Sequence, residues 1–264
     1  MSDAELLRGA AETAVHQCLG LDGDESCLIV TDDERERIGW ALYDVASEVT
    51  DDALCFQYGP LDQHGQEPHD AVARALAEVD TFLAPTTKSL SHTRARQHAS
   101  EAGARGATLP GITEDVFLTG LDADYASIAE HCERVLDRIA GADEIRVTAP
   151  AGTDLTIQVG NREWRSDTGM IRDAGDFSNL PAGEVFVSPE SANGRYVVDG
   201  TMRPHGLLTD RTLAFEVEDG YVTHIEDDEI REQVEAAADE VGRDAYNLAE
   251  LGIGTNVGVE ALVG

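Results

Sequence analysis

Lysine is almost absent from this chain, and positive charge of any kind is scarce. Only 19 of the 264 residues are lysine or arginine, and Lys88 is the single lysine. Against them stand 52 aspartates and glutamates, which gives a formal net charge of -33. Nucleic acids and anionic membranes are bound by clustered basic side chains. The composition therefore argues against both kinds of partner.

Long apolar runs and paired cysteine motifs are also missing. The sequence has no stretch of 18 or more apolar residues and no apolar segment behind a basic N-terminus. We therefore expect neither a membrane span nor a secretory signal. The cysteines have no CxxC spacing and lie among apolar residues, which predicts buried thiols rather than metal ligands or disulfides: Cys18, Cys27, Cys55 and Cys132. We expect a cytoplasmic protein.

The acidic residues are spread along the whole chain rather than gathered in one tail. They are interspersed with apolar residues at regular spacing, and 42% of all residues are apolar, enough for a substantial core. A folded surface rich in carboxylates stays hydrated when concentrated salt screens its self-repulsion. The composition thus predicts a halophilic folded protein rather than an acidic disordered one.

The first half of the chain alternates predicted strands with predicted helices. Ser2 and Glu5 have the spacing of a capping box that begins an N-terminal helix. We then expect strands at 27–31, 53–58, 81–84 and 107–109, and helices at 34–49, 69–79, 91–102, 114–120 and 124–140. This order favours an α/β fold with a doubly wound, mainly parallel sheet covered by helices on both faces. We assign residues 1–141 to this N-terminal, Rossmann-like domain.

From Gly141 onward the pattern changes to strands and turns. Two hairpins are predicted, one pairing 144–149 with 153–159 and one pairing 213–217 with 221–225. A helix whose apolar face runs from Ile230 to Leu248 follows, and it brings Glu250 near its end. We assign residues 142–264 to a strand-rich, mixed α+β domain of catalytic type.

The loop 85–93 leaves a predicted strand of the first sheet. Ligands of open α/β sheets bind outside the carboxyl ends of the strands, so we expect Lys88, Ser91 and His92 to contact substrate. The alternative is structural: Ser91 caps the next helix, Thr93 supports its first turn, and Lys88 is a surface residue. The loop 31–35, after the first strand, is acidic and lacks glycine, which argues against a bound dinucleotide.

Two glutamates lie in apolar, glycine-containing segments of the second half. Glu184 follows Pro181 and Gly183 at the start of an apolar strand, and Glu250 precedes a glycine-rich segment. An unpaired carboxylate in such surroundings is costly, so the pair predicts divalent-metal ligands or a general acid and base. The alternative is that each glutamate caps backbone amides or pairs with an arginine.

Five segments, in the same order, resemble those of the aminopeptidase T and aminopeptidase S metallopeptidases, also called the thermophilic metalloprotease family. They are SLSHT at 89–93, TLPGIT at 108–113, GTDL at 152–155, NLPAGEV at 179–185 and AELGIGTN at 249–256. The resemblance runs from about residue 25 onward. It implies that Glu184 and Glu250 are ligands in a two-metal centre, that peptides are the substrates of an aminopeptidase, and that the protein is a homodimer. The metals it implies are zinc or cobalt, with manganese or magnesium as alternatives.

The resemblance also implies an incomplete site. Members of that family continue beyond the second glutamate into a segment that supplies two histidines, an aspartate and a tyrosine, and this sequence stops before them at Gly264. Two carboxylates alone underfill a zinc site. We therefore expect a truncated member, with the general base unidentified and hydrolysis by this chain in doubt.

Two other functions stay open at this stage. Ring-cleaving dioxygenases of the dihydroxypyridine type resemble the same family but use a single iron. A non-catalytic binding or assembly protein that kept the fold and lost the chemistry would also explain the missing ligands.

Overall fold

The computed structural model describes residues 2–259 and 262, whose contacts form two compact units. The first unit contains the residues up to Cys132 together with Asp167–Gly183 and Thr255–Val259, and the second contains Glu133–Ser166 and Glu184–Gly254. The division falls after Cys132, inside the helix α6 (Tyr125–Ile139), rather than at Gly141. The predicted division into domains at Gly141 stays a prediction.

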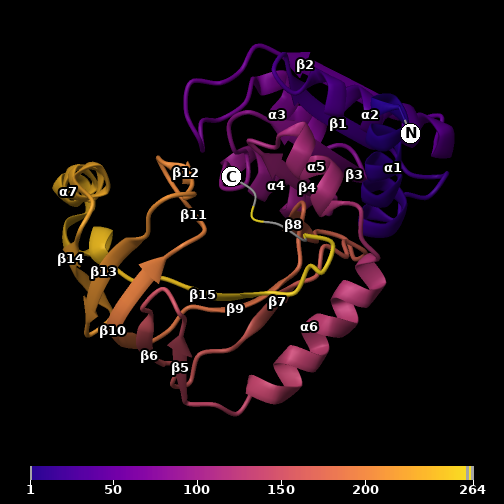
Figure 1. Cartoon of the computed structure of the whole chain (residues 1–264). Helices are drawn as coiled ribbons and strands as arrows, with labels where there is room; N and C mark the ends of the chain where they lie inside the picture. The colour runs from indigo at the N-terminus through magenta and orange to yellow at the C-terminus, as the bar shows by residue number, and fades with distance from the viewer. Residues whose placement is uncertain (1, 260–261, 263–264) are drawn as a thin grey trace. The chain divides into compact units, whose positions relative to one another are not determined.

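The first unit is built on a five-stranded parallel sheet in the order β2-β1-β3-β4-β8 (Figure 1). Its strands are β1 (Cys27–Asp32), β2 (Ala53–Tyr58), β3 (Thr81–Thr86), β4 (Arg105–Pro110) and β8 (Phe177–Asn179). Every residue of β1 and β3 is buried, as expected of central strands with both faces covered. The predicted α/β fold with a parallel sheet is confirmed.

Helices connect these strands. They are α1 (Asp3–Glu12), which continues as a π-helical segment (Thr13–Leu19), α2 (Glu36–Val49), α3 (Asp70–Leu76), α4 (Arg94–Ala102), α5 (Glu114–Gly120) and α6 (Tyr125–Ile139). The capping box of Ser2 and Glu5 is present, and the first helical segment ends at Gly20 in the left-handed conformation.

The first core forms where the helices meet the sheet. Leu28, Val30 and Phe82 of the strands pack with Leu76 and Ala99 of α3 and α4. On α2, a Cβ atom at Gly39 would lie 2.6 Å from the side chain of Thr31 on β1. Glycine is therefore required for the helix to approach the strand this closely.

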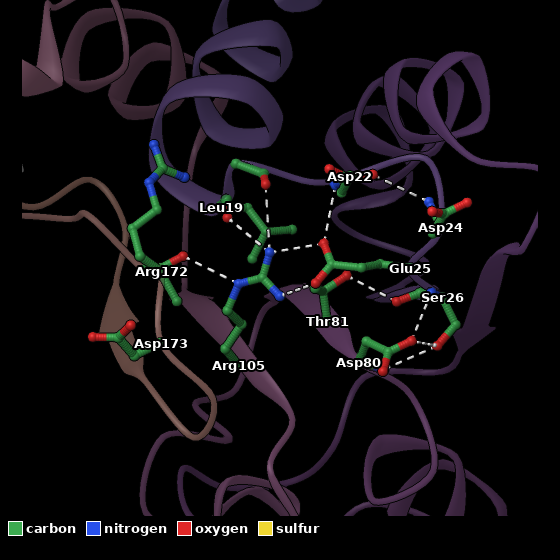
Figure 2. A network of polar contacts seen from close by, with 12 residues as sticks. Leu19, Asp22, Asp24, Glu25, Ser26, Asp80, Thr81, Arg105, Arg172 and Asp173 are labelled. Carbon is green, nitrogen blue, oxygen red and sulfur yellow. Dashed lines mark hydrogen bonds and ion pairs between the residues drawn. The ribbon is translucent and has the colours of Figure 1, made fainter.

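A network of polar contacts fastens the amino ends of the central strands (Figure 2). Arg105, at the start of β4, is 8% exposed and pairs with Glu25 through Nη1 and Nη2 of its guanidinium. It also donates to the carbonyl oxygens of Ile171 and Leu19. Asp80 accepts from the backbone and hydroxyl of Ser26 at 2.9 and 2.8 Å. The charged groups at the amino ends of these strands are thus paired or hydrogen-bonded.

The second unit contains a five-stranded antiparallel sheet in the order β14-β13-β10-β6-β5. Its strands are β5 (Glu144–Thr148), β6 (Asp154–Gln158), β10 (Ser191–Val198), β13 (Leu213–Glu218) and β14 (Tyr221–Ile225). Both predicted hairpins are present, and the turn residues Asp219 and Gly220 have φ values of 50° and 82°. Two positive φ values match the turn expected of an Asp-Gly pair.

Smaller elements complete the second unit. They are the ribbon β11 (Thr201–Met202) and β12 (Gly206–Leu207), the sheet β15 (Leu251–Gly254), β9 (Glu184–Val187) and β7 (Arg165–Asp167), and the helix α7 (Asp228–Val241), which a 3-10 turn (Gly242–Tyr246) follows. The prediction that this helix extends to Glu250 was wrong. It ends at Val241 because Gly242 turns the backbone away with a φ of 70°.

Two sequence expectations concern solubility and thiols. Within residues 2–259, no helix has the length and apolar character needed to cross a bilayer. Cys18, Cys27 and Cys132 are buried as predicted, whereas Cys55 is half-buried. Burial raises the pKa of Cys27 and Cys55 to about 11, which keeps these thiols protonated.

Candidate functional site

The two glutamates of the second unit flank one antiparallel strand pair. Glu184 begins β9, and Glu250 immediately precedes β15. In the ladder, Glu184 pairs with Gly254, and Phe186 pairs with Gly252. The chain reaches this arrangement because Val185 and Val187 bury their side chains on one face of the β9–β15 strand pair, hereafter the ribbon, at 0% and 1% exposure. Alternation then directs Glu184 to the other face.

The second face carries glycines, which add no side chains around Glu184. Gly252 and Gly254 share it with Glu184, and continuing the alternation by one residue places Glu250 there as well. The Glu184 carboxylate lies directly over Gly252, where a Cβ atom would be 2.8 Å from Oε2. A larger residue at position 252 would therefore displace the carboxylate.

The strand register also sets the distance between the backbone positions of Glu184 and Glu250. Glu184 pairs with Gly254, so Glu250 starts four residues, or about 13 Å, farther along the ribbon at roughly 3.3 Å per residue. The Glu184 carboxylate covers half of this distance by reaching Gly252. About 7 Å along the ribbon then remains between the Glu184 carboxylate and the backbone of Glu250.

The two glutamates differ in burial. Glu184 is half-buried, but Glu250 is exposed. The expectation that both lie in enclosed apolar surroundings was wrong for Glu250, because the glycines around it add no side chains to exclude water. An exposed carboxylate needs no partner for its stability. A functional role for Glu250 therefore rests on its position rather than on burial.

The donor set of this face is compatible with a hard divalent cation but does not complete a site. Carboxylate oxygens are the ligands that such cations prefer. Within residues 2–259, however, no three His, Cys, Asp or Glu side chains are placed to share one ion. The described residues therefore supply at most two carboxylates, and they do not by themselves form the two-metal centre expected from the sequence.

A second polar group lies at the carboxyl ends of the strands in the first unit. Ser91 Oγ and Thr108 Oγ1 are 2.7 Å apart, and both donate to Asn179 Oδ1, at 2.8 and 2.7 Å. Ser91 and Thr108 are 2% and 1% exposed, whereas Asn179 is exposed. We call Ser91, Thr108 and Asn179 the hydroxyl–amide cluster. It ties the loop after β3 to strands β4 and β8.

The other predicted substrate residues lie in the same loop. Lys88 is half-buried, and His92 is exposed. Ser91 does not cap helix α4, because Thr93 occupies that position and accepts from the backbone N–H of Arg96 at 3.2 Å. The structure thus replaces the capping role proposed for Ser91 with a role in the cluster. Contact of these residues with substrate stays a prediction.

Sequence reasoning missed Thr108 and Asn179. Both belong to segments that carried the family resemblance, as does Ser91, so three separate segments meet at one point of the sheet. That convergence was a usable signal, because parallel strands bring their carboxyl ends to one edge. Uncharged hydroxyls and amides, however, indicate a site less specifically than carboxylates and histidines do.

One buried carboxylate at this edge also escaped notice. Asp32, at the end of β1, is 1% exposed and accepts from the backbone N–H and the hydroxyl of Thr87 at 2.5 and 3.0 Å. The backbone N–H of Glu34 donates to it at 3.1 Å. Three donors satisfy this charge, so Asp32 fixes the start of the loop that carries Lys88.

Comparison with known proteins places these features in a family. Residues 42–260 match the family described as NicX, 2,5-dihydroxypyridine 5,6-dioxygenase. No curated protein matches the chain. The fold is similar to that of the 2,5-dihydroxypyridine dioxygenase from Pseudomonas putida KT2440, with a TM-score of 0.73 and 18% identity over 96% of this chain and 76% of that one. It is also similar to wild-type AmpT from Thermus thermophilus, with a TM-score of 0.68 and 17% identity over 99% of this chain and 82% of that one.

These findings correct the function expected from the sequence. The resemblance to aminopeptidase T holds for the fold, but the family match is to 2,5-dihydroxypyridine 5,6-dioxygenases, so the assignment as a peptide-hydrolysing aminopeptidase was wrong. The motifs misled because two families that share one fold also share the segments that build it. A metal cofactor fits both families, but the preference for zinc or cobalt followed from the peptidase assignment. The family match spans both glutamates and the hydroxyl–amide cluster, and the chain belongs to the NicX family of 2,5-dihydroxypyridine 5,6-dioxygenases.

Proposed function

We propose that this protein is a metal-dependent dioxygenase that opens the ring of a hydroxylated pyridine. The observation that carries the proposal is the family match over residues 42–260. The fold shared with a dihydroxypyridine dioxygenase over 96% of the chain supports it. Glu184 and Glu250 supply two carboxylates beside the glycines of β15, and hard divalent cations prefer such oxygen ligands.

Iron(II) is the metal we propose. Non-haem iron oxygenases hold their metal with carboxylate and imidazole ligands and leave positions open for substrate and oxygen. Glu184 and Glu250 would supply the carboxylates, and the described residues place no third acidic, histidine or cysteine side chain within reach. When bound, iron(II) supplies the activation of oxygen that the ring-opening reaction needs.

The chain's own residues would orient the ring. Lys88 and His92 lie in the loop that Asp32 and the hydroxyl–amide cluster hold at both of its ends. An ammonium group and an imidazole can hydrogen-bond to the hydroxyl groups of a hydroxypyridine. We propose Lys88, Ser91 and His92 as the substrate-binding side of the protein, with Ser91 acting as the anchor of the loop.

The test combines metal binding with oxygen consumption. The protein is loaded anaerobically with iron(II) in molar potassium chloride and then mixed with 2,5-dihydroxypyridine and oxygen. We expect one oxygen consumed per ring opened, and at least tenfold weaker iron binding in Glu184→Gln and in Glu250→Gln. Glu218→Gln is the control, because Glu218 is an exposed residue of β13 outside the ribbon.

Two results would contradict the proposal. Iron binding that is equal in all three variants would remove both glutamates from the metal site. Iron bound at Glu184 and Glu250 without any consumption of oxygen would favour the alternative of a binding protein that kept the fold without the chemistry.

A further inference from the structure

A polar pocket of about 320 Å³ lies in the second unit, on the segment between β6 and β7 and the end of β9. Its lining consists of Asn161, Arg162, Glu163, Arg165, Phe186, Val187 and Ser188. Two of these residues are arginines, in a chain that has only 19 basic residues against 52 acidic ones. A concentration of positive charge in so acidic a protein calls for an explanation.

The side chains of Arg162 and Arg165 have no partner among the described residues. Other arginines form ion pairs, such as Arg146 with Asp154 at 2.8 Å and Arg195 with Glu216 at 2.8 Å. Within the part of the chain that the structure describes, the side chains of Arg162 and Arg165 form neither an ion pair nor a hydrogen bond. Each guanidinium therefore keeps its planar set of N–H donors available, and that set fits the two oxygens of a carboxylate.

The loop that carries Arg162 is held in place. The backbone N–H of Asn161 donates to Glu190 Oε1 at 3.3 Å, and Gly160 adopts a φ of 60° beneath the same carboxylate. A Cβ atom at Gly160 would lie 2.2 Å from Glu190 Oε2, so only glycine fits there. Because the turn is fixed, Arg162 emerges from an ordered part of the chain, which lowers the entropic cost of binding.

The pocket shares one residue, Phe186, with the face of the β9–β15 strand pair that carries Glu184. Phe186 lines it, and Phe186 pairs with Gly252 on the same face as Glu184. Ser188, at the other end of the lining, falls opposite Glu250 when the ladder is continued by one residue. A molecule in this pocket would thus have the aromatic ring of Phe186 beside it.

We propose that Arg162 and Arg165 form an anion-binding subsite that recognises a carboxylate on a single-ring aromatic substrate. The identification of that ligand as the substrate rests on the proposed dioxygenase function, but the anion subsite itself does not. Phe186 offers a ring-stacking surface, which favours an aromatic carboxylate over inorganic phosphate. The subsite would select carboxylated hydroxypyridines over uncharged ones.

Two features oppose the binding of an anion and must be overcome. The chain has a net charge of -33, and Glu163 itself lines the pocket. In 1 M salt the Debye length is only about 3 Å, so the distant carboxylates are screened and contacts within the pocket dominate. Glu163 lines the pocket itself, so its neutralisation should strengthen binding.

The experiment measures ligand binding to the metal-free protein, with chelator present, in 1 M potassium chloride. Calorimetry with benzoate, phenol and inorganic phosphate compares an anionic ring, a neutral ring and a non-aromatic anion. We expect benzoate to bind at least tenfold more tightly than phenol and more tightly than phosphate. Arg162→Gln and Arg165→Gln should each weaken benzoate at least tenfold, and Glu163→Gln should tighten it.

Arg146→Gln is the matched control, because Arg146 is an exposed arginine of β5 in the same unit and outside the pocket. Benzoate that binds no more tightly than phenol, or equally to the Arg162, Arg165 and Arg146 variants, would overturn the subsite. Tighter binding of phosphate than of benzoate would overturn the aromatic ligand class. Because metal is absent, these outcomes are independent of whether the loaded protein consumes oxygen.

Discussion

A substitution at Gly252 should move the Glu184 carboxylate without destabilising the strand pair β9–β15. An added Cβ atom at position 252 would lie 2.8 Å from Oε2 of Glu184, whereas ordinary contacts begin at 3.4 Å. In Gly252→Ala the carboxylate must therefore move by about 0.6 Å or more. Metal–ligand distances tolerate only about 0.2 Å. We expect this substitution to weaken iron(II) binding about tenfold, or about 1.4 kcal/mol.

The same substitution should not destabilise the fold. The atom it would contact is the far end of a flexible side chain, and Gly252 has no positive φ. Replacing glycine by alanine at a compatible strand position stabilises a protein by about 0.4–1 kcal/mol, chiefly by restricting the unfolded chain. The midpoint of urea unfolding should consequently stay the same or rise while metal affinity falls.

Gly254→Ala is the matched control. Gly254 lies on the same face of the same strand, but its added Cβ atom would have nothing within 4 Å. Anaerobic titration with iron(II) should give wild-type affinity for this variant and a similar small gain in stability. Equal metal affinity of the two alanine variants would refute the reasoning, because it would show that the Glu184 position over Gly252 is irrelevant to the metal.

Further predictions concern the first unit and the acidic surface. Arg105→Met leaves the Glu25 carboxylate without its partner and should lower the free energy of unfolding in urea by about 3 kcal/mol. Arg146→Met, at an exposed ion pair, should lower it much less, and equal losses would contradict this reasoning. Arg105 lowers the pKa of Glu25 below its ordinary value of 4.5. The ion pair therefore stabilises the fold above pH 4.5, and this stabilisation is lost as the pH falls below that value. Arg105→Met should not show this loss. Ser91→Ala removes a buried donor to Asn179 and should cost about 1–3 kcal/mol, and an unchanged melting temperature would exclude the cluster as an anchor. Dilution from molar salt into dilute buffer should unfold or aggregate the protein because its net charge of -33 is then unscreened; full retention of structure by circular dichroism would contradict the predicted adaptation to salt.

Local patterns in the sequence were sufficient to predict most elements of the fold. Apolar periodicity and the capping box located α1, α2 and the strands of the parallel sheet because these elements bury continuous faces. The Asp219–Gly220 turn located the second hairpin for a similar reason, since its backbone conformation depends on those two residues alone. Strand β8 was missed because it is three residues long and joins the first sheet from a distant part of the chain.

The candidate site was less accessible to sequence reasoning. The prediction of Glu184 and Glu250 as metal ligands came from motifs, and motifs cannot separate two families that share a fold. The pairing of Glu184 with Gly254 depends on a strand register across about 70 residues of chain, and no local pattern encodes it. The pocket around Arg162 depends on how residues 161–165 lie against the end of β9, so it emerged only with the structure.

The position of β8 has a consequence for synthesis of the chain. Strand β4 ends at Pro110, but its neighbour β8 ends at Asn179, so about 70 further residues must be made before the parallel sheet gains its last strand. At about 5–20 residues per second, the ribosome needs roughly 4–14 s for this interval. During that time β4 presents an unpaired edge, of the kind that templates association between chains. The acidic character of the nascent chain, through mutual repulsion between neighbouring copies, would protect it over those seconds.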